Sequence, residues 1–261
     1  MTPDFYLDLT IGGTGGAGTK GDPYRSFADI PAYTGGAAKN ILVTGSTGVS
    51  GTINIPQGYT YYAATPQIIG DFGGEVVIDF TNVAFETTLQ NLIFRGRIHH
   101  DTANTELVTF NWCRFQRDFD ANNNRFVYLR KPMTFNQCTF SGRCGSPGTN
   151  QSAFLQASSN ASYAVKFNRC MMYVKAYQNG TGGICASSYI YNTHTGCLHH
   201  FIEDESSPTS LTNWIDVQVD CYRAGDSPSN LGTAIDGGDF LFVDPITHNL
   251  ELLDNSPVHL L

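Results

Sequence analysis

The chain has 261 residues, enough for one large domain or two small ones, and its formal net charge is −8 at pH 7. A nucleic-acid-binding surface needs clustered Lys and Arg, so this charge argues against that class of function. A membrane-spanning helix needs about 18 consecutive apolar residues, and the sequence contains no such run.

The chain begins with a strand-like segment and a glycine-rich loop. Residues 4–10 alternate apolar and polar side chains, as a strand with one buried face does. The loop Gly12–Gly21 contains the dinucleotide-binding glycine pattern, which binds a pyrophosphate only where a helix begins at its last glycine. Gly21 and Pro23 follow the last glycine of the pattern and prevent such a helix. We therefore interpret the segment as a plain loop and expect no cofactor.

A short helical segment and a series of strands follow. Residues 22–30 suit one or two helical turns with Phe27 and Ile30 on one face, and Pro31 ends them. Short apolar runs separated by turn residues then predict strands. These runs cover residues 41–45, 52–55, 60–63, 67–69, 76–80 and 89–94.

A phrase repeated three times organises the middle of the chain. The copies begin at Thr109, Thr134 and Lys166, 25 and then 32 residues apart, and each continues with Phe, Asn and, two residues later, Cys. Such a period is typical of repeat architectures in which each copy is one supersecondary unit. Weaker echoes follow at residues 190–193 and 217–222.

The phrase predicts a bend within each copy. In a strand, Cys138 and Phe140 share a face, whereas Phe135 has the opposite parity. Asn tolerates a left-handed conformation, so a one-residue corner at Asn136 would turn all three side chains inward. The predicted core stack consists of Phe110, Asn111, Cys113, Phe135, Asn136, Cys138, Phe167, Asn168 and Cys170.

The opening of the chain, from strand through glycine loop and short helix to the Ile-Leu-Val strand, resembles that of right-handed parallel β-helix proteins. Bacterial surface proteins, pectate-lyase-like enzymes and phage tailspike-like proteins belong to this superfamily. The resemblance implies an all-β solenoid of about eight coils in one domain, residues 1–261, whose short N-terminal helix covers the open end. Residues 1–40 would form this cap and entry, 41–235 the coils, and 236–261 a closing coil and tail.

A leucine-rich repeat is the rival interpretation, because it also has an Asn or Cys at a fixed place and a period of about 20–29 residues. We prefer the β-helix, since leucine is sparse, the inward residues are aromatic, and no helical segment fits between the copies. The seven cysteines are an odd number and three of them fall at the inward position. This usage predicts reduced core thiols in a protein made in a cytoplasm. Residues 1–4 lead into strand-like sequence with no basic start or apolar signal region, so we expect synthesis in the host cytoplasm without a signal peptide.

Many β-helix proteins cleave polysaccharides with paired carboxylates. If the protein were an enzyme, the candidates would be Asp118, Asp120, Glu203, Asp204 and Glu205. We interpret both groups as polar surface loops instead, and expect no catalytic residues. Two histidine pairs, His99-His100 and His199-His200, cannot chelate a metal alone because consecutive strand residues face opposite ways. We therefore expect no metal site.

The resemblance then suggests a virion structural protein, either a phage capsid decoration protein or a short spike. Its partners would be copies of itself, forming a homotrimer, and capsid or tail proteins, with no nucleic acid and no membrane. The apolar tail with Val258, Leu260 and Leu261 is the candidate docking segment. A polysaccharide-degrading enzyme of the tailspike or pectate-lyase-like kind is the main alternative. A noncatalytic carbohydrate-binding surface protein is the third, with a host surface glycan as its partner.

Overall fold

The structure is a computed structural model. It describes residues 1–48, 51–71, 76–81, 85–100, 107–119, 125–129, 132–144, 153–157, 163–176, 183–185, 190–203, 217–219, 222–225, 235–236, 242–244 and 249–252. Within these ranges the protein is all-β with parallel sheets, and its only helix is η1 (Phe27–Asp29), a single 3-10 turn. None of the described segments is a helix long and apolar enough to span a membrane.

A 15-stranded sheet forms two ladders of parallel strands that share β4 and β6. Ladder one consists of β1 (Phe5–Asp8), β2 (Lys39–Thr44), β4 (Tyr59–Gly70), β6 (Thr87–Arg95), β8 (Val108–Asn111), β11 (Met133–Asn136), β14 (Tyr163–Asn168), β17 (Ile190–Thr195) and β19 (Val217–Val219). Ladder two continues from β4 and β6 through β9 (Arg114–Phe119), β12 (Thr139–Cys144), β15 (Met171–Ala176), β18 (Leu198–Glu203), β20 (Tyr222–Gly225) and β21 (Ile235–Asp236).

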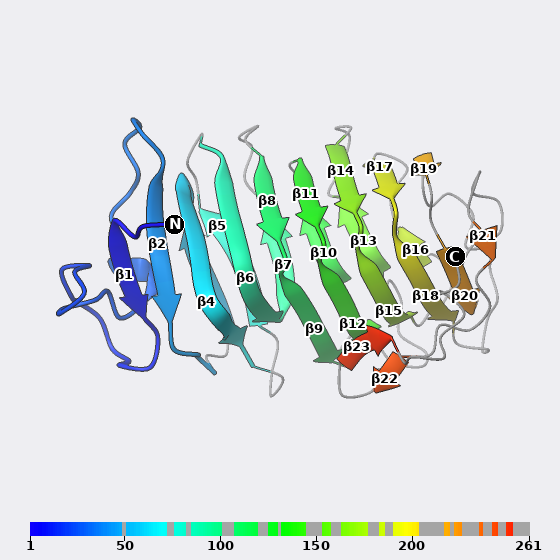
Figure 1. The fold of residues 1–261 in the computed structure, drawn as a ribbon, viewed down its shortest axis with the longest axis horizontal. Helices are drawn as coiled ribbons and strands as arrows, with labels where there is room; N and C mark the ends of the chain where they lie inside the picture. The colour runs from blue at the N-terminus through cyan, green and yellow to red at the C-terminus, as the bar shows by residue number, and fades with distance from the viewer. Residues whose placement is uncertain are drawn as a thin grey trace.

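A separate six-stranded parallel sheet forms ladder three. Its strands are β3 (Gly51–Pro56), β5 (Val76–Thr81), β7 (Arg97–His100), β10 (Arg125–Leu129), β13 (Ala153–Ala157) and β16 (Gly183–Cys185). The chain visits the three ladders in turn, from β8, β9 and β10 to β11, β12 and β13, and then to β14, β15 and β16. Successive strands of each ladder therefore lie side by side along the long axis of the molecule (Figure 1).

The three ladders share one hydrophobic core that runs from Leu7 to Cys197. Its middle part consists of identical residues stacked in register, since Phe110 pairs with Phe135 and Phe135 with Phe167. Their rings are nearly parallel, with centroids 5.0 and 4.9 Å apart. Residues of equivalent backbone geometry repeat at the strand spacing of about 4.8 Å, so their side chains adopt equivalent positions and stack face to face.

Beside the rings run two more columns of the predicted core stack. Asn168 Nδ2 donates to Asn136 Oδ1, and Asn136 Nδ2 donates to Asn111 Oδ1, both at 2.8 Å. Cys113, Cys138 and Cys170 are buried free thiols. The structure extends this column with Cys197, which follows β17 and which the sequence pattern did not identify.

The corner within each copy is one residue later than the sequence analysis placed it. Asn136 belongs to strand β11, and the left-handed residue is Gln137, with φ +51°. The Asn136 side chain forms hydrogen bonds with Asn111 and Asn168 on the two neighbouring strands. The Gln137 N–H donates to the Asn168 carbonyl oxygen. These contacts between strands decide which residue turns, and they override the intrinsic preference of Asn for this conformation.

The N-terminal edge is covered by loop backbone, where the sequence analysis expected a helix. Strand β1 pairs with β2 on one side. On its other side, Tyr24 N–H donates to the Tyr6 carbonyl and Asp8 N–H donates to the Tyr24 carbonyl, while Tyr6 N–H donates to the Gly18 carbonyl. An open sheet edge would leave these groups unpaired. The expected capping helix is reduced to the 3-10 turn η1, whose Phe27 is buried.

One strand boundary needs correction. Residues 60–63 and 67–69 belong to one irregular strand, β4, in which the register against β6 shifts between Tyr62 and Gln67. At the C-terminus, β22 (Phe242–Asp244) and β23 (Asn249–Leu252) pair antiparallel in a two-stranded sheet of their own. Within the described residues, the parallel ladders end at β21, which pairs parallel with β20.

Candidate functional site

Two of the candidate catalytic carboxylates lie on strands and not in surface loops. Asp118 is a residue of β9, in register with Arg143 of β12, and Glu203 is the last residue of β18, in register with Ala176 of β15. The structure thus corrects the loop interpretation for both. Asp120, Asp204, Glu205 and the docking candidates Val258, Leu260 and Leu261 lie outside the described residues.

In the first histidine pair, the structure describes the side chain of His99. His99 Nδ1 lies 3.6 Å from Asp79 Oδ1 on the neighbouring strand of ladder three, and its ring stacks on Tyr128 with centroids 5.1 Å apart. Ile98, the preceding residue, is buried in the core. His199 and His200 are strand residues of β18. In the part of the chain that the structure describes, no three His, Cys, Asp or Glu residues group to hold a metal ion.

The cysteine column has the character of core packing and not of a nucleophile. Cys138 is fully buried, and burial raises the pKa of its thiol well above the usual value. Its Sγ lies 3.5 Å from the Phe110 carbonyl oxygen and 3.4 Å from the Asn136 carbonyl oxygen. A catalytic cysteine needs an accessible thiolate, so this side chain is unsuited to that role.

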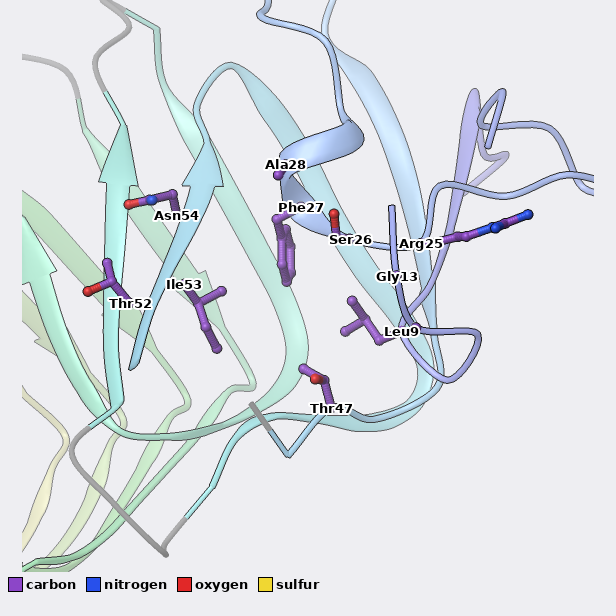
Figure 2. A pocket seen from close by; sticks show the side chains of 11 residues that line it. Leu9, Gly13, Arg25, Ser26, Phe27, Ala28, Thr47, Thr52, Ile53 and Asn54 are labelled. Carbon is purple, nitrogen blue, oxygen red and sulfur yellow. The ribbon is translucent and has the colours of Figure 1, made fainter. Parts of the chain in front are cut away.

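A pocket of about 260 Å³ lies at the N-terminal end, beneath the glycine loop. Leu9, Phe27 and Ile53 form its apolar part, and Arg25 extends away from Phe27 and Ile53 (Figure 2). Its remaining lining residues are Gly12, Gly13, Ser26, Ala28, Thr47, Thr52 and Asn54. Ligand pockets usually enclose about 300–1,000 Å³ around a few converging polar groups. This pocket is smaller, and no ionisable group points into it.

Asp29 holds the glycine loop against the 3-10 turn beside this pocket. Its Oδ1 accepts from the Gly15 N–H at 2.7 Å, and its Oδ2 accepts from the Ser26 N–H at 2.9 Å and from the Ser26 hydroxyl at 2.8 Å. Burial tends to raise the pKa of this carboxyl group, but these hydrogen bonds outweigh burial and lower the pKa below its usual value. The carboxylate is therefore a structural anchor.

A ridge follows the corner between ladders one and two, and the side chains of its middle members, Trp112, Gln137 and Arg169, are exposed. We define the corner ridge as the left-handed residues of successive copies, namely Asn91, Trp112, Gln137, Arg169 and Gly196. Backbone hydrogen bonds fix its spacing, because each corner N–H donates to the carbonyl before the next corner. These bonds are 2.9 Å for Trp112, 2.8 Å for Gln137 and 2.7 Å for Arg169.

Trp112 is the unusual member of the corner ridge. Its side chain is 51% exposed, and its φ of +52° is a conformation that bulky residues rarely adopt. Asn and Gly, at the two ends of the ridge, tolerate this conformation far better, and the cost for other L-residues is about 1–2 kcal/mol. Strained residues of this kind concentrate at functional sites, so the observation motivates a functional hypothesis.

The indole of Trp112 is held in place by its neighbour on the ridge. Its Nε1–H donates to Gln137 Oε1 at 2.6 Å. On the next copy, the side chain of Arg169 extends over Gly196, where a Cβ atom would lie 3.4 Å from Arg169 Cγ. The ridge thus presents an oriented aromatic ring, an amide and a guanidinium group in sequence.

Positive charge gathers around this ridge in a protein with a net charge of −8. Arg114 is exposed two residues after Trp112, and Lys166 is exposed three residues before Arg169. The side chains of Asp4, Asp8, Asp22, Asp29, Asp71, Asp79 and Glu86 are the carboxylates that the structure describes, while Asp118 lies on β9, the strand that begins at Arg114. The ridge is therefore the strongest candidate site among the described residues. A signal for it was present, because the residue after the repeated Asn is Trp, Gln or Arg and does not repeat.

Comparison of the chain with protein-family models, with curated protein sequences and with solved structures gives no match in any of the three.

Proposed function

We propose that the three ladders are the sides of successive coils of a right-handed parallel β-helix. The chain visits the ladders in a fixed order, and all pairings within them are parallel. Crossover connections between parallel strands of one sheet are right-handed in about 98% of cases. One core cluster contains residues of all three ladders, which supports coils that enclose it. The loop backbone and the η1 turn would serve as the N-terminal cap.

We propose further that this β-helix is a virion structural protein, a capsid decoration protein or a short spike. The observation that carries the proposal is the column of four free thiols, Cys113, Cys138, Cys170 and Cys197. Strands in a sheet are about 4.8 Å apart, which is within the Cα separation that disulfides need. In an oxidising compartment, neighbouring thiols at this spacing could form disulfides. Their unpaired state therefore suits a reducing cytoplasm, which is where virion proteins are made. A rigid solenoid also supplies a long, repetitive surface for assembly.

Purified particles test this proposal. Virus-like particles from the organism that carries the gene would be separated on a density gradient, and their proteins identified by mass spectrometry. We expect the chain in the particle fraction together with capsid or tail proteins. Recovery of the chain only in particle-free fractions would contradict a virion role.

The polysaccharide-degrading alternative gains one observation, the strand position of Asp118 in register with Arg143. Incubation of the purified chain with host polysaccharides, followed by assays for new reducing ends and unsaturated products, tests it. We expect no turnover. Turnover that disappears in Asp118→Asn or Glu203→Gln would establish the enzyme instead.

The oligomeric state is a separate proposal. We propose a homotrimer that docks on the particle through one end of the β-helix, with Val258, Leu260 and Leu261 as the predicted contact. Light scattering tests self-association, because a 28.5 kDa species at micromolar concentration would contradict it. Deletion of residues 257–261 tests the tail, which is expected to be required for assembly or for particle binding.

A further inference from the structure

The first strand of ladder three has an unpaired edge. Strand β3 pairs with β5 on one side. On its other side, within the described part of the chain, residues 51–55 form no backbone hydrogen bond. Such an edge presents a row of free N–H and C=O groups with which an extended peptide can pair. Thr52 and Asn54, which flank the pocket residue Ile53, are exposed, so solvent reaches this part of the strand.

The pocket of about 260 Å³ lies between this edge and the glycine loop. Figure 2 shows Ile53 of β3 at one side, Phe27 and Leu9 in the middle, and Gly13 and Arg25 at the opposite side. A whole small-molecule ligand usually needs about 300–1,000 Å³. One apolar side chain of a peptide, together with its terminal group, is smaller than such a ligand and suits this volume.

The polar groups at the glycine-loop side of the pocket are hydrogen-bond donors. The N–H groups of Gly12 and Gly13 donate no hydrogen bond within the described part of the chain. Arg25 Nε is buried and has no hydrogen-bond partner among the described residues. A buried donor without an acceptor is destabilising, and a guanidinium group binds carboxylates strongly. This side of the pocket therefore favours an anionic acceptor.

The neighbouring carboxylates do not supply that acceptor. Those of Asp8, Asp22 and Asp29 each accept a backbone N–H of their own segment, at 2.9, 3.1 and 2.7 Å. None of the three lines the pocket, whereas Arg25 does. The lining thus combines a free strand edge, an apolar part, and a positively charged side with free amide donors.

We propose that this pocket binds the C-terminal end of an extended peptide from a partner protein. The last residues of the peptide add a strand to β3, and the terminal apolar side chain enters the apolar part of the pocket. The α-carboxylate accepts hydrogen bonds from Gly12, Gly13 and Arg25. Strand addition to a sheet edge and capture of a terminal carboxylate by backbone amides are both established modes of peptide recognition. The site is independent of the virion proposal, because it depends only on the N-terminal end of the fold.

Fluorescence polarisation with a labelled hexapeptide measures the binding. The probe is fluorescein-Ser-Thr-Val-Thr-Val-Leu with a free carboxylate, because β-branched residues favour an extended chain. The same peptide with a C-terminal amide should bind at least about tenfold more weakly, since the carboxylate provides the charge-assisted bonds. Salt should weaken the binding of the free-carboxylate probe. No binding of that probe, or equal affinity of the amide, would overturn the proposal.

Methylation of the peptide backbone tests the strand addition. Alternate residues of a strand direct their N–H groups to the same edge. Of two probes methylated at alternate sets of nitrogens, one should therefore bind at least about fivefold more weakly than the other, because it loses its bonds to β3. Octanoate, which has a carboxylate and an apolar chain but no amide groups, should compete only weakly. Equal affinities of the two methylated probes, or competition by octanoate as strong as that by the unlabelled peptide, would overturn the proposal.

Variants assign the binding to the pocket, with circular dichroism to verify the fold of each. Arg25→Gln should weaken the free-carboxylate probe about fivefold and leave the amide unchanged, which a general loss of structure would not do. Ala28→Trp fills the pocket from an exposed position and should weaken both peptides. Lys20→Gln removes the same charge as Arg25→Gln from an exposed loop position outside the lining and should change neither. Parent-like affinity of Arg25→Gln, or an equal loss in Lys20→Gln, would overturn the proposal.

Discussion

The N-terminal end and the middle of this molecule pack aromatic residues in different ways. At the N-terminal end, Tyr33, Tyr59 and Tyr61 meet edge to face, with interplanar angles of 69° and 61°. In the middle, Phe110, Phe135 and Phe167 lie nearly parallel, with angles of 5° and 8°. The residues at the end have a different chemistry as well as a different geometry.

The tyrosines at the end each have a hydrogen-bond partner for the hydroxyl group. Tyr59 donates to the Pro31 carbonyl at 2.8 Å, and Tyr61 donates to the Pro56 carbonyl at 2.7 Å. Tyr33 donates to the Gly36 carbonyl at 2.8 Å. Two of these bonds join the core to loop residues, and the bond of Tyr61 joins it to the end of β3. A ring in the middle of the stack has a neighbouring copy on both sides, whereas a ring at the end has one on a single side. The exposed side of the last copy is therefore covered by other segments, to which the tyrosine hydroxyl groups bind.

The largest expected effect comes from placing a charge within the middle stack. Cys138→Asp buries a carboxyl group that has no cationic partner in the thiol column, and it should cost more than about 4 kcal/mol of folding free energy. Urea unfolding followed by circular dichroism measures the loss. Cys138→Ala is the control and should fold. In the parent, Cys113, Cys138 and Cys170 should resist thiol reagents until the protein unfolds, and rapid labelling would contradict their buried position.

The next effect tests whether stacking is shared between copies. Phe135→Ala removes a ring that lies between Phe110 and Phe167 and should cost about 3–5 kcal/mol. Phe135→Leu keeps most of the volume and should cost clearly less. Because both neighbours lose a stacking partner, a double substitution with Phe167→Ala should be less destabilising than the sum of the single substitutions. Strict additivity, measured by urea unfolding, would show that the copies pack independently.

The tyrosine end should show a pH dependence of its own. Burial raises the pKa of Tyr61 well above its ordinary value of 10.0. The folded state therefore keeps the proton that the unfolded state releases, so this contribution to stability is complete below pH 10 and is lost as the pH rises further. Tyr61→Phe should cost about 1–3 kcal/mol at neutral pH, because the Pro56 carbonyl loses its donor. It should also flatten the fall in thermal stability above pH 10. An unchanged alkaline profile would contradict the buried hydroxyl.

The smallest effect is a gain in stability at the corner ridge. Trp112→Asn places a residue that tolerates a positive φ at a strained position, and it should stabilise the fold by up to about 1 kcal/mol. Gln137→Asn is the matched variant at the next corner and should gain a similar amount, because it also places Asn at a positive φ and removes the same bond between Trp112 and Gln137. Differential scanning calorimetry resolves such shifts. A destabilised Trp112→Asn protein would mean that the indole is part of the packing.

The repeated phrase made the middle of the molecule predictable. Side-chain parity and the recurrence of Phe, Asn and Cys placed those residues in stacked columns, and both depend only on local geometry. The candidate site was not predicted. Trp112 belongs to the first copy of the repeated phrase. The exposure of its side chain depends on the direction of the corner and on the neighbouring residues, which the phrase alone does not specify.

Alternation and repetition are properties of neighbouring residues, so they specify the strand-forming segments, the spacing of the copies and the residue types of the inner columns. The position of the left-handed corner depends instead on tertiary contacts, because the amide of Asn136 is engaged by Asn111 and Asn168. Tertiary contacts also place loop backbone beside β1 and pair β22 antiparallel with β23. Each of these outcomes depends on hydrogen bonds between segments distant in sequence, and no local pattern encodes them.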